Sequence, residues 1–204
     1  MFTKRNLSTL LNRSVPDVKA KRKLWEKVIS ENDVNKLIFL DECGVNTDMT
    51  RHYARSKSNE RAVDSTPVNT PCSTTILSSV RLNGQTAYTV YHGGTTAEQF
   101  AEYLKSILLP TLSKDDIIVM DNMRSHHAKT VKKILDASGI RCLYLPPYSP
   151  DFNPIEKMWS KIKAYLRKVK IRVATELPNA IDKAFLTVCP SDCSGWFSSC
   201  YCVR

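Results

Sequence analysis

The sequence predicts one α/β domain, built on a mixed sheet of five strands and flanked by helices. Short apolar runs alternate with helical patterns in the second half of the chain, which indicates parallel strands joined by helices. Two β-rich runs joined through Asn83 and Gly84 predict a hairpin, which adds antiparallel pairing. The length of 204 residues suits a single compact domain with modest extensions.

The elements of the first half follow from apolar spacing and turn residues. A helix is expected where apolar residues recur at helical spacing after Pro16. A buried strand is expected where a short apolar run stops on Asp41 and Glu42, with Gly44 and Asn46 as turn residues after it. In chain order we expect a helix over 17–30, a strand over 36–41, a polar loop over 51–71 and strands over 73–82 and 85–91.

The second half of the chain alternates helices and strands. Thr95 or Thr96 caps a first helix, and Gly139 suits the left-handed end of the next one. Asn153 is expected to cap the helix that starts at Pro154. In chain order we expect a helix to about 109, a strand over 116–120, a helix over 127–138, a strand over 140–145 and helices over 154–170 and 175–188.

This order divides the chain into three parts. They are an N-terminal linker with a helix over 1–35, a main domain over 36–188 and a C-terminal tail rich in Cys and Ser over 189–204. The tail holds four of the seven cysteines, but their spacing is not that of a familiar zinc ribbon. We therefore expect free thiols, with a zinc site as the alternative.

The charge predicts a polyanionic partner. The chain carries 30 Lys and Arg against 20 Asp and Glu, a formal net charge of +10. Unopposed Lys and Arg bind phosphates, largely through counterion release. Between Lys157 and Thr175, on and just beyond the helix over 154–170, the chain has no acidic residue and seven basic ones: Lys157, Lys161, Lys163, Arg167, Lys168, Lys170 and Arg172. We interpret them as a nucleic-acid contact, with a solvated helix face as the alternative.

The sequence gives no sign of a membrane protein or a secreted one. No apolar run approaches the roughly 18 residues that a spanning helix needs. The start, Met1 to Leu11, lacks the apolar core and the cleavage site of a secretory signal. We expect a cytoplasmic location and no membrane partner.

Three acidic residues stand where ligand sites form in α/β sheets. Asp41 and Asp121 each close a buried strand, and Glu156 lies in the first turn of the helix after the next strand. Carboxylates in one cleft repel one another, and Mg²⁺ or Mn²⁺ relieves that repulsion. Two such ions about 4 Å apart can activate the attacking oxygen and stabilise the leaving oxygen of a phosphodiester. The alternative is structural, because acids are common at strand ends and helix starts.

Three motifs resemble the signature of bacterial insertion-sequence transposases of the mariner superfamily. The motifs are Phe39-Leu-Asp41-Glu42, Val119-Met-Asp121-Asn122 with His126 after it, and Leu145-Pro-Pro-Tyr-Ser-Pro-Asp-Phe-Asn-Pro-Ile-Glu156 followed by Trp159 and Lys163. The 34 residues between Asp121 and Glu156 match the spacing of that bacterial branch. The similarity extends over nearly the whole chain.

The resemblance implies an RNase H-like domain of the retroviral integrase type. In such a domain Asp41, Asp121 and Glu156 would hold two Mg²⁺ or Mn²⁺ ions. The implied reaction is hydrolysis of a phosphodiester at the transposon ends, followed by attack of the freed 3′-hydroxyl on target DNA. The partner is then DNA, the basic helix face would contact it, and the protein would associate with the nucleoid when bound.

The resemblance also implies accessory residues and an assembly. Asn122 and His126 match the family motif and would orient a metal-bound water or touch a phosphate, with a helix-start position as the alternative for His126. Asn153 belongs to the matching loop, which is also a rigid connector that delivers Glu156. Cutting and joining two DNA ends implies a homodimer during the reaction.

Family members carry an N-terminal helix-turn-helix region, which we expect to be missing here because only about 40 residues precede Asp41. The chain would then be a fragment, a decayed copy or one half of a split element whose helix-turn-helix protein is encoded separately. A catalytically silent DNA-binding remnant or regulator is the alternative function. A general RNase H-type nuclease is disfavoured by the Pro-Pro-Tyr-Ser-Pro motif.

Overall fold

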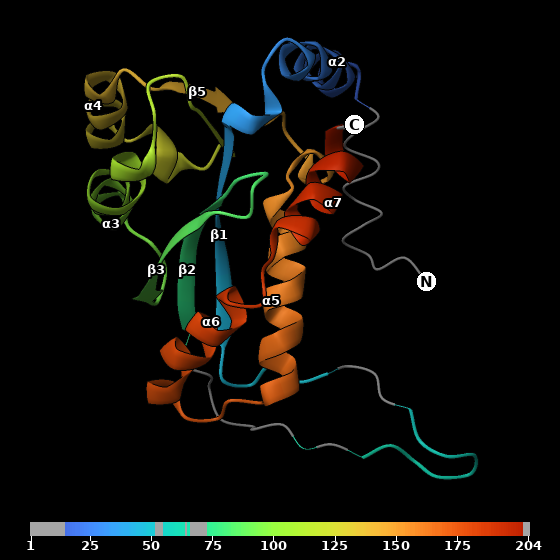
Figure 1. Cartoon of the computed structure of the whole chain (residues 1–204). Helices are drawn as coiled ribbons and strands as arrows, with labels where there is room; N and C mark the ends of the chain where they lie inside the picture. The colour runs from blue at the N-terminus through green and yellow to red at the C-terminus, as the bar shows by residue number, and fades with distance from the viewer. Residues whose placement is uncertain (1–14, 52–54, 64, 66–72, 202–204) are drawn as a thin grey trace.

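The computed structural model describes residues 15–51, 55–63, 65 and 73–201. About half of the loop expected over 51–71 lies outside these residues. The described part is a mixed sheet covered by helices on both faces (Figure 1). No helix within it is long and apolar enough to cross a membrane.

The sheet has five strands in the order β3-β2-β1-β4-β5. The strands are β1 (Leu37–Asn46), β2 (Ser73–Val80), β3 (Thr86–His92), β4 (Ile117–Met120) and β5 (Arg141–Tyr144). Strands β1, β2 and β3 pair antiparallel, whereas β1, β4 and β5 pair parallel. The hairpin turns at Gly84, whose φ of 88° a residue with a side chain rarely adopts. The predicted mixed sheet is confirmed.

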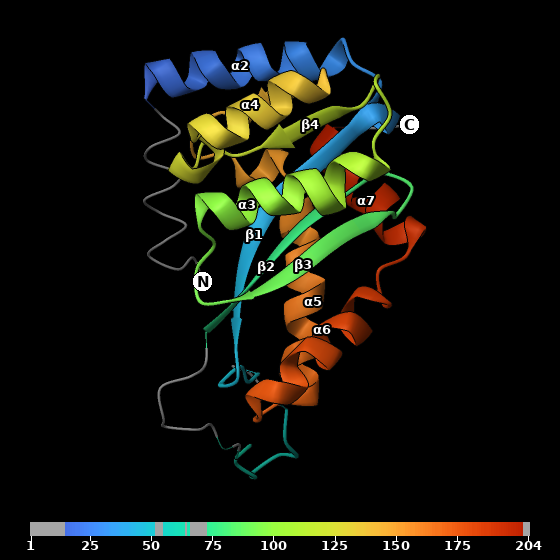
Figure 2. The same ribbon diagram turned by 90° about the vertical axis from the view of Figure 1, so that its left-hand side faces the viewer.

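Helices cover both faces of the sheet (Figure 2). They are α2 (Pro16–Ser30), α3 (Ala97–Tyr103), α4 (Lys129–Ser138), α5 (Ile155–Val169), α6 (Leu177–Phe185) and α7 (Pro190–Tyr201). Leu37 and Phe39 of β1 pack with α5, α6 and α7, whereas Ile38 and Leu40 pack with α3 and α4. Burial on both faces explains why the start of β1 is a continuous apolar run.

Two predicted helix ends are confirmed. The Thr96 side chain accepts from the Gln99 amide, and the Gln99 side chain accepts from the Thr96 amide, which forms a capping box before α3. Gly139 ends α4 in the left-handed conformation, with φ of 68°. The helix expected to reach about residue 109 continues from α3 as a π-helical turn, Leu104–Leu108, and a short 3-10 turn, Leu109–Thr111.

Strand β1 is longer than predicted, and Gly44 and Asn46 lie within it rather than in a turn. Antiparallel pairing with β2 continues as far as Asn46, opposite Ser73. Parallel pairing with β4 covers only Leu37 to Phe39. Asp41 therefore lies inside a strand, just beyond the point where its neighbour β4 has ended.

The C-terminal segment expected as a tail forms α7 and packs against the sheet. Cys193 and Phe197 are fully buried, and the Phe197 ring meets Phe39 edge-on at 5.4 Å between centroids. The Tyr201 ring stacks on Phe39 at 5.6 Å. Interspersed Ser and Gly hid these apolar positions four residues apart. The described cysteines are free thiols, and no group of Cys, His or acidic side chains in the described residues is arranged to hold a metal ion.

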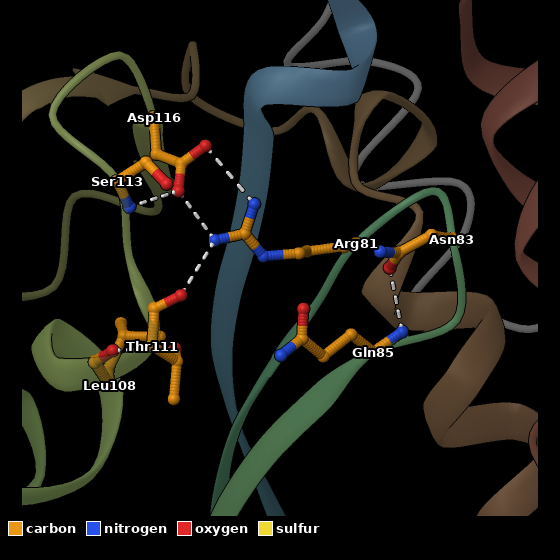
Figure 3. Close-up of polar contacts among 7 residues, drawn as sticks. All are labelled: Arg81, Asn83, Gln85, Leu108, Thr111, Ser113 and Asp116. Atoms are coloured by element: carbon orange, nitrogen blue, oxygen red, sulfur yellow. Dashed lines mark hydrogen bonds and ion pairs between the residues drawn. The ribbon is translucent and has the colours of Figure 1, made fainter.

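A buried ion pair ties the hairpin to the start of β4 (Figure 3). Arg81, just after β2, donates to both carboxylate oxygens of Asp116 at 3.2 and 2.6 Å. Asp116 is 3% exposed and also accepts from the Ser113 amide. Burial alone would raise the pKa of Asp116, but the hydrogen bonds from Arg81 and Ser113 lower it below its usual value. Asp116 was expected inside the strand and instead precedes it.

Candidate active site

The sheet register brings Asp41 and Asp121 together. Phe39 of β1 pairs with Val119 of the parallel strand β4. Asp41 and Asp121 each follow two positions later, so they lie side by side at the same edge of the sheet. Asp121 comes directly after β4 ends at Met120. Open α/β sheets form ligand sites at this carboxyl edge.

Asp41 is held by two donors. Its Oδ1 accepts from the Glu42 amide at 2.8 Å, and its Oδ2 accepts from the indole Nε1 of Trp159 at 3.2 Å. Burial and the negative charges of Glu156 and Asp121 raise the pKa of Asp41 to about 7. Burial and these two charges therefore disfavour its ionised form.

Asp121 has the opposite environment. Its Oδ1 accepts from the Met123 amide at 3.1 Å and from Nδ1 of His126 at 2.9 Å. Burial would raise the pKa of Asp121, but these hydrogen bonds and the neighbouring imidazoles outweigh it and hold the pKa below its usual value. These contacts thus keep Asp121 ionised and fix its orientation.

His126 lies beneath Asp121 rather than in the cleft. Its side chain is fully buried, its ring stacks on Phe100 at 4.4 Å, and its Nε2 lies 3.9 Å from Oε1 of Glu42. Burial disfavours the imidazolium, yet the Asp121 and Glu42 carboxylates raise the pKa of His126 to about 9. The structure thus places His126 against Asp121, Glu42 and Phe100, and the expected contact with a phosphate or a metal-bound water stays a prediction.

The two asparagines support the backbone around the cleft. Asn122 Nδ2 donates to the Leu145 carbonyl at 2.8 Å, which links the ends of β4 and β5. Asn153 is 4% exposed, and its side chain does not cap α5 as expected. Its backbone carbonyl accepts from the Glu156 amide instead, because a 3-10 turn, Pro150–Phe152, brings the chain into the helix.

Glu156 lies in the first turn of α5 and faces the same cleft as the two aspartates. Burial and the charge of Asp121 raise the pKa of Glu156, although Lys163 opposes them. The cleft measures about 370 Å³. Its remaining walls come from the end of β4 and from the β5–α5 loop: Asn122, Met123, Leu145, Pro146, Pro147, Tyr148, Ser149, Pro150 and Asn153.

Carboxylate oxygens are the donors that hard divalent cations prefer, and mutual repulsion among the three acids favours such a cation. The donor set of the cleft therefore fits Mg²⁺ or Mn²⁺. In the described part of the chain, however, no three acidic, His or Cys side chains are arranged to bind one ion as they stand.

The structure separates the seven basic residues into groups. Lys157 contacts Ser199, Lys161 pairs with Asp192, and both contacts join α5 to α7. Arg172 donates to the carbonyls of Thr47 and Met49 at 2.8 and 3.1 Å. These three residues make contacts within the protein, which distinguishes them from the other members of the predicted DNA-binding set.

Lys163 and Arg167 instead line a polar hollow of about 510 Å³ beside the end of β1. They follow Glu156 by seven and eleven positions, so all three share one face of α5. Lys168 and Lys170 are exposed near the end of the helix.

Trp159 and Arg22 are residues near the cleft whose roles were not predicted from the sequence. Trp159 belongs to a quoted motif, and its spacing of three from Glu156 places both residues on adjacent turns of α5 near the cleft. Arg22 of α2 donates to Ser149, 127 residues later, and no local sequence signal marks such a contact.

The fold and the acidic cleft are those of an endonuclease domain. The chain belongs to the DDE superfamily of endonucleases, whose family model matches residues 36–177. None of the curated proteins matches the chain in sequence.

Solved structures of the Mos1 transposase share the fold. A Mos1 paired-end complex with the left transposon end has a TM-score of 0.73 at 14% identity, and a pre-cleavage Mos1 transpososome has 0.70 at 13%. They cover 98% and 90% of this chain, which spans 60% and 58% of theirs. The catalytic domain of Mos1 mariner transposase has a TM-score of 0.60 at 14% identity, covering 93% of this chain and 89% of that one. The predicted RNase H-like fold is confirmed.

Proposed function

We propose that this chain is the catalytic domain of a DNA transposase. It would hydrolyse a phosphodiester at the transposon ends and then join the freed 3′-hydroxyl to target DNA. The observation that carries the proposal is one cleft lined by Asp41, Asp121 and Glu156 in a DDE superfamily domain. The fold shared with Mos1 transpososomes supports it.

Asp41, Asp121 and Glu156 would hold two Mg²⁺ or Mn²⁺ ions. The pKa of Asp41, raised to about 7 by burial and the two other carboxylates, supports a cation site, because a cation would offset the buried negative charge. Mos1 mariner paired-end complexes with Mn and with Mg are consistent with that choice. When bound, the ions would supply charge stabilisation to the attacking and leaving oxygens of the phosphodiester.

The chain's own groups would orient the carboxylates before the substrate arrives. The Trp159 indole holds one oxygen of Asp41, and the Met123 amide and His126 hold one oxygen of Asp121. Two donors on one oxygen limit the rotation of the Asp121 carboxylate. A fixed orientation of the ligands is what an active site requires.

DNA would approach along α5 from the cleft. Lys163 and Arg167 share the helix face of Glu156, and we assign them to phosphate contacts, with Lys168 and Lys170 farther along the helix. We further propose a homodimer during the reaction, a helix-turn-helix region or partner for end recognition, and a cytoplasmic, nucleoid-associated location. A catalytically silent DNA-binding remnant is less consistent with three intact acids in one cleft.

Cleavage of labelled transposon-end DNA tests the proposal. The protein, alone and joined to an end-binding domain, is incubated with the DNA and Mg²⁺ or Mn²⁺. We expect cleavage by the wild type and by the exposed-acid control Glu98→Ala, and none by Asp121→Ala or Glu156→Ala. Cleavage that persists undiminished in both carboxylate variants would refute the triad. A joined protein that binds the DNA without cutting it would favour the silent binder.

A further inference from the structure

The wall of the cleft contains one residue in an unfavourable backbone conformation. Tyr148, between β5 and α5, has φ of 55°, in the left-handed region that bulky residues rarely adopt. Its side chain is 52% exposed although it lines the cleft that holds the three acids. Such strain persists only where the surroundings over-determine it, and it concentrates at functional sites.

A hydrogen-bonded bridge holds Tyr148 in place. The hydroxyl of Ser149 donates to the Pro147 carbonyl at 3.0 Å, which closes the backbone across Tyr148. The same hydroxyl accepts from Nη1 of Arg22 at 2.6 Å. Ser149 is 5% exposed, so this bridge is shielded from water.

Arg22 itself is firmly anchored on the same loop. Its guanidinium also donates to both carboxylate oxygens of Asp151, at 3.2 and 2.7 Å. It lies 4.1 Å over the ring of Phe152. This two-pronged, planar contact is one that lysine cannot reproduce. We name the contacts of Arg22 with Ser149, Asp151 and Phe152 the Arg22 clamp.

The Tyr148 ring stands at the mouth of the cleft, half exposed to solvent, whereas a ring that stabilises the core is buried. Met123, another lining residue, is 41% exposed, so the acidic cleft has apolar surface beside it. A phosphodiester placed at the carboxylates would bring its neighbouring bases toward the same cleft, and unpaired bases stack on aromatic side chains whatever their sequence.

We propose that the Tyr148 ring is the surface on which an unpaired DNA base next to the scissile phosphate stacks, and that the Arg22 clamp positions it. The inference rests on the proposed function and adds a base-binding subsite to it. Tyr148 would contribute stacking, whereas Lys163 and Arg167 would contribute charge. The two contributions differ in salt dependence, because only phosphate contacts release counterions.

The test uses a short DNA duplex whose 3′ overhang carries 2-aminopurine, with Ca²⁺ in place of Mg²⁺. Stacking on an aromatic ring quenches the fluorescence of this base. We expect wild type and Tyr148→Phe to quench it, and Tyr148→Ala to lose the quenching. Tyr148→Ala should bind the overhang DNA roughly 5- to 150-fold more weakly, with an unchanged salt slope, and should bind blunt duplex as wild type does.

Arg22→Ala should lose part of the quenching, and Arg22→Lys should not restore it fully. Adding Arg22→Ala to Tyr148→Ala should cost nothing further, because the clamp acts through the ring. Leu186→Ala, an exposed apolar control at the end of α6, should behave as wild type.

Quenching that survives in Tyr148→Ala would overturn the subsite, and additive losses in the double variant would overturn the role of the clamp. A wild-type protein that binds neither DNA would instead overturn the proposed function, and the subsite with it. Binding without Tyr148-dependent quenching would remove the subsite alone.

Discussion

Replacing both Lys163 and Arg167 with alanine should reduce the salt dependence of DNA binding. These two residues share the α5 face of Glu156 and line the polar hollow next to the cleft. Each phosphate contact contributes about 0.9 to the slope of log affinity against log salt, so losing two should flatten the slope by about 1.8. Between 50 and 200 mM salt, the wild type should then lose about 12-fold more affinity than the double variant.

The chain offers a matched control on the same helix. Lys157→Ala with Lys161→Ala removes the same charge, but these lysines contact Ser199 and Asp192 of α7. Fluorescence anisotropy with a labelled duplex over a salt series gives both slopes. The control should change the slope by less than half as much, although it should lower stability. Equal slope changes in the two double variants would refute the division of the basic residues.

The remaining predictions concern stability and the carboxylates. Arg81→Ala should lower the free energy of unfolding by about 3–5 kcal/mol in urea titrations, because it leaves Asp116 buried and unpaired; a loss below 1 kcal/mol would contradict this. Trp159→Phe should lower cleavage about 10-fold or more while largely keeping the fold, because Asp41 loses a donor; unchanged cleavage would show that the indole is dispensable. Without metal, the pKa of Asp41 near 7 means that the folded state binds more protons than the unfolded one, so stability should fall from about pH 4 to 7 relative to Asp41→Asn; a rise would contradict the raised pKa.

The sheet could be predicted because its signals are local. The four-residue apolar run before Asp41, the Asn83-Gly84 turn and Gly139 each depend on neighbouring residues alone, and all three predictions are confirmed. The length of β1 could not be predicted, since its second half is held only by pairing with β2, more than 25 residues later. Helix α7 was missed because its apolar positions are few, and they become meaningful only against Phe39.

The sequence predicted which acidic residues line the cleft, but not which contacts the surrounding side chains make. The spacing and the motifs predicted Asp41, Asp121 and Glu156 as site residues, and these three line one cleft. No sequence pattern distinguishes a lysine that meets Asp192 from one that faces the hollow, because that depends on how α7 packs. The same holds for His126, whose burial under Asp121 follows from Phe100 and Glu42 on other elements.

The membership of a bacterial branch and the absence of a helix-turn-helix region stay predictions. A neighbouring reading frame that encodes such a region would support the split-element interpretation. The catalytic proposal does not depend on it, because the three acids lie within the matched residues 36–177.

Counting bound Mn²⁺ tests the central claim most directly. Electron paramagnetic resonance of free Mn²⁺, titrated into the protein with cleaved-end DNA, gives the number of ions that each chain binds. The account predicts two ions in the wild type and fewer, more weakly held, in Asp41→Asn, Asp121→Asn and Glu156→Gln, with Glu98→Gln unchanged. Equal binding of Mn²⁺ in the wild type and in all three cleft variants would contradict it.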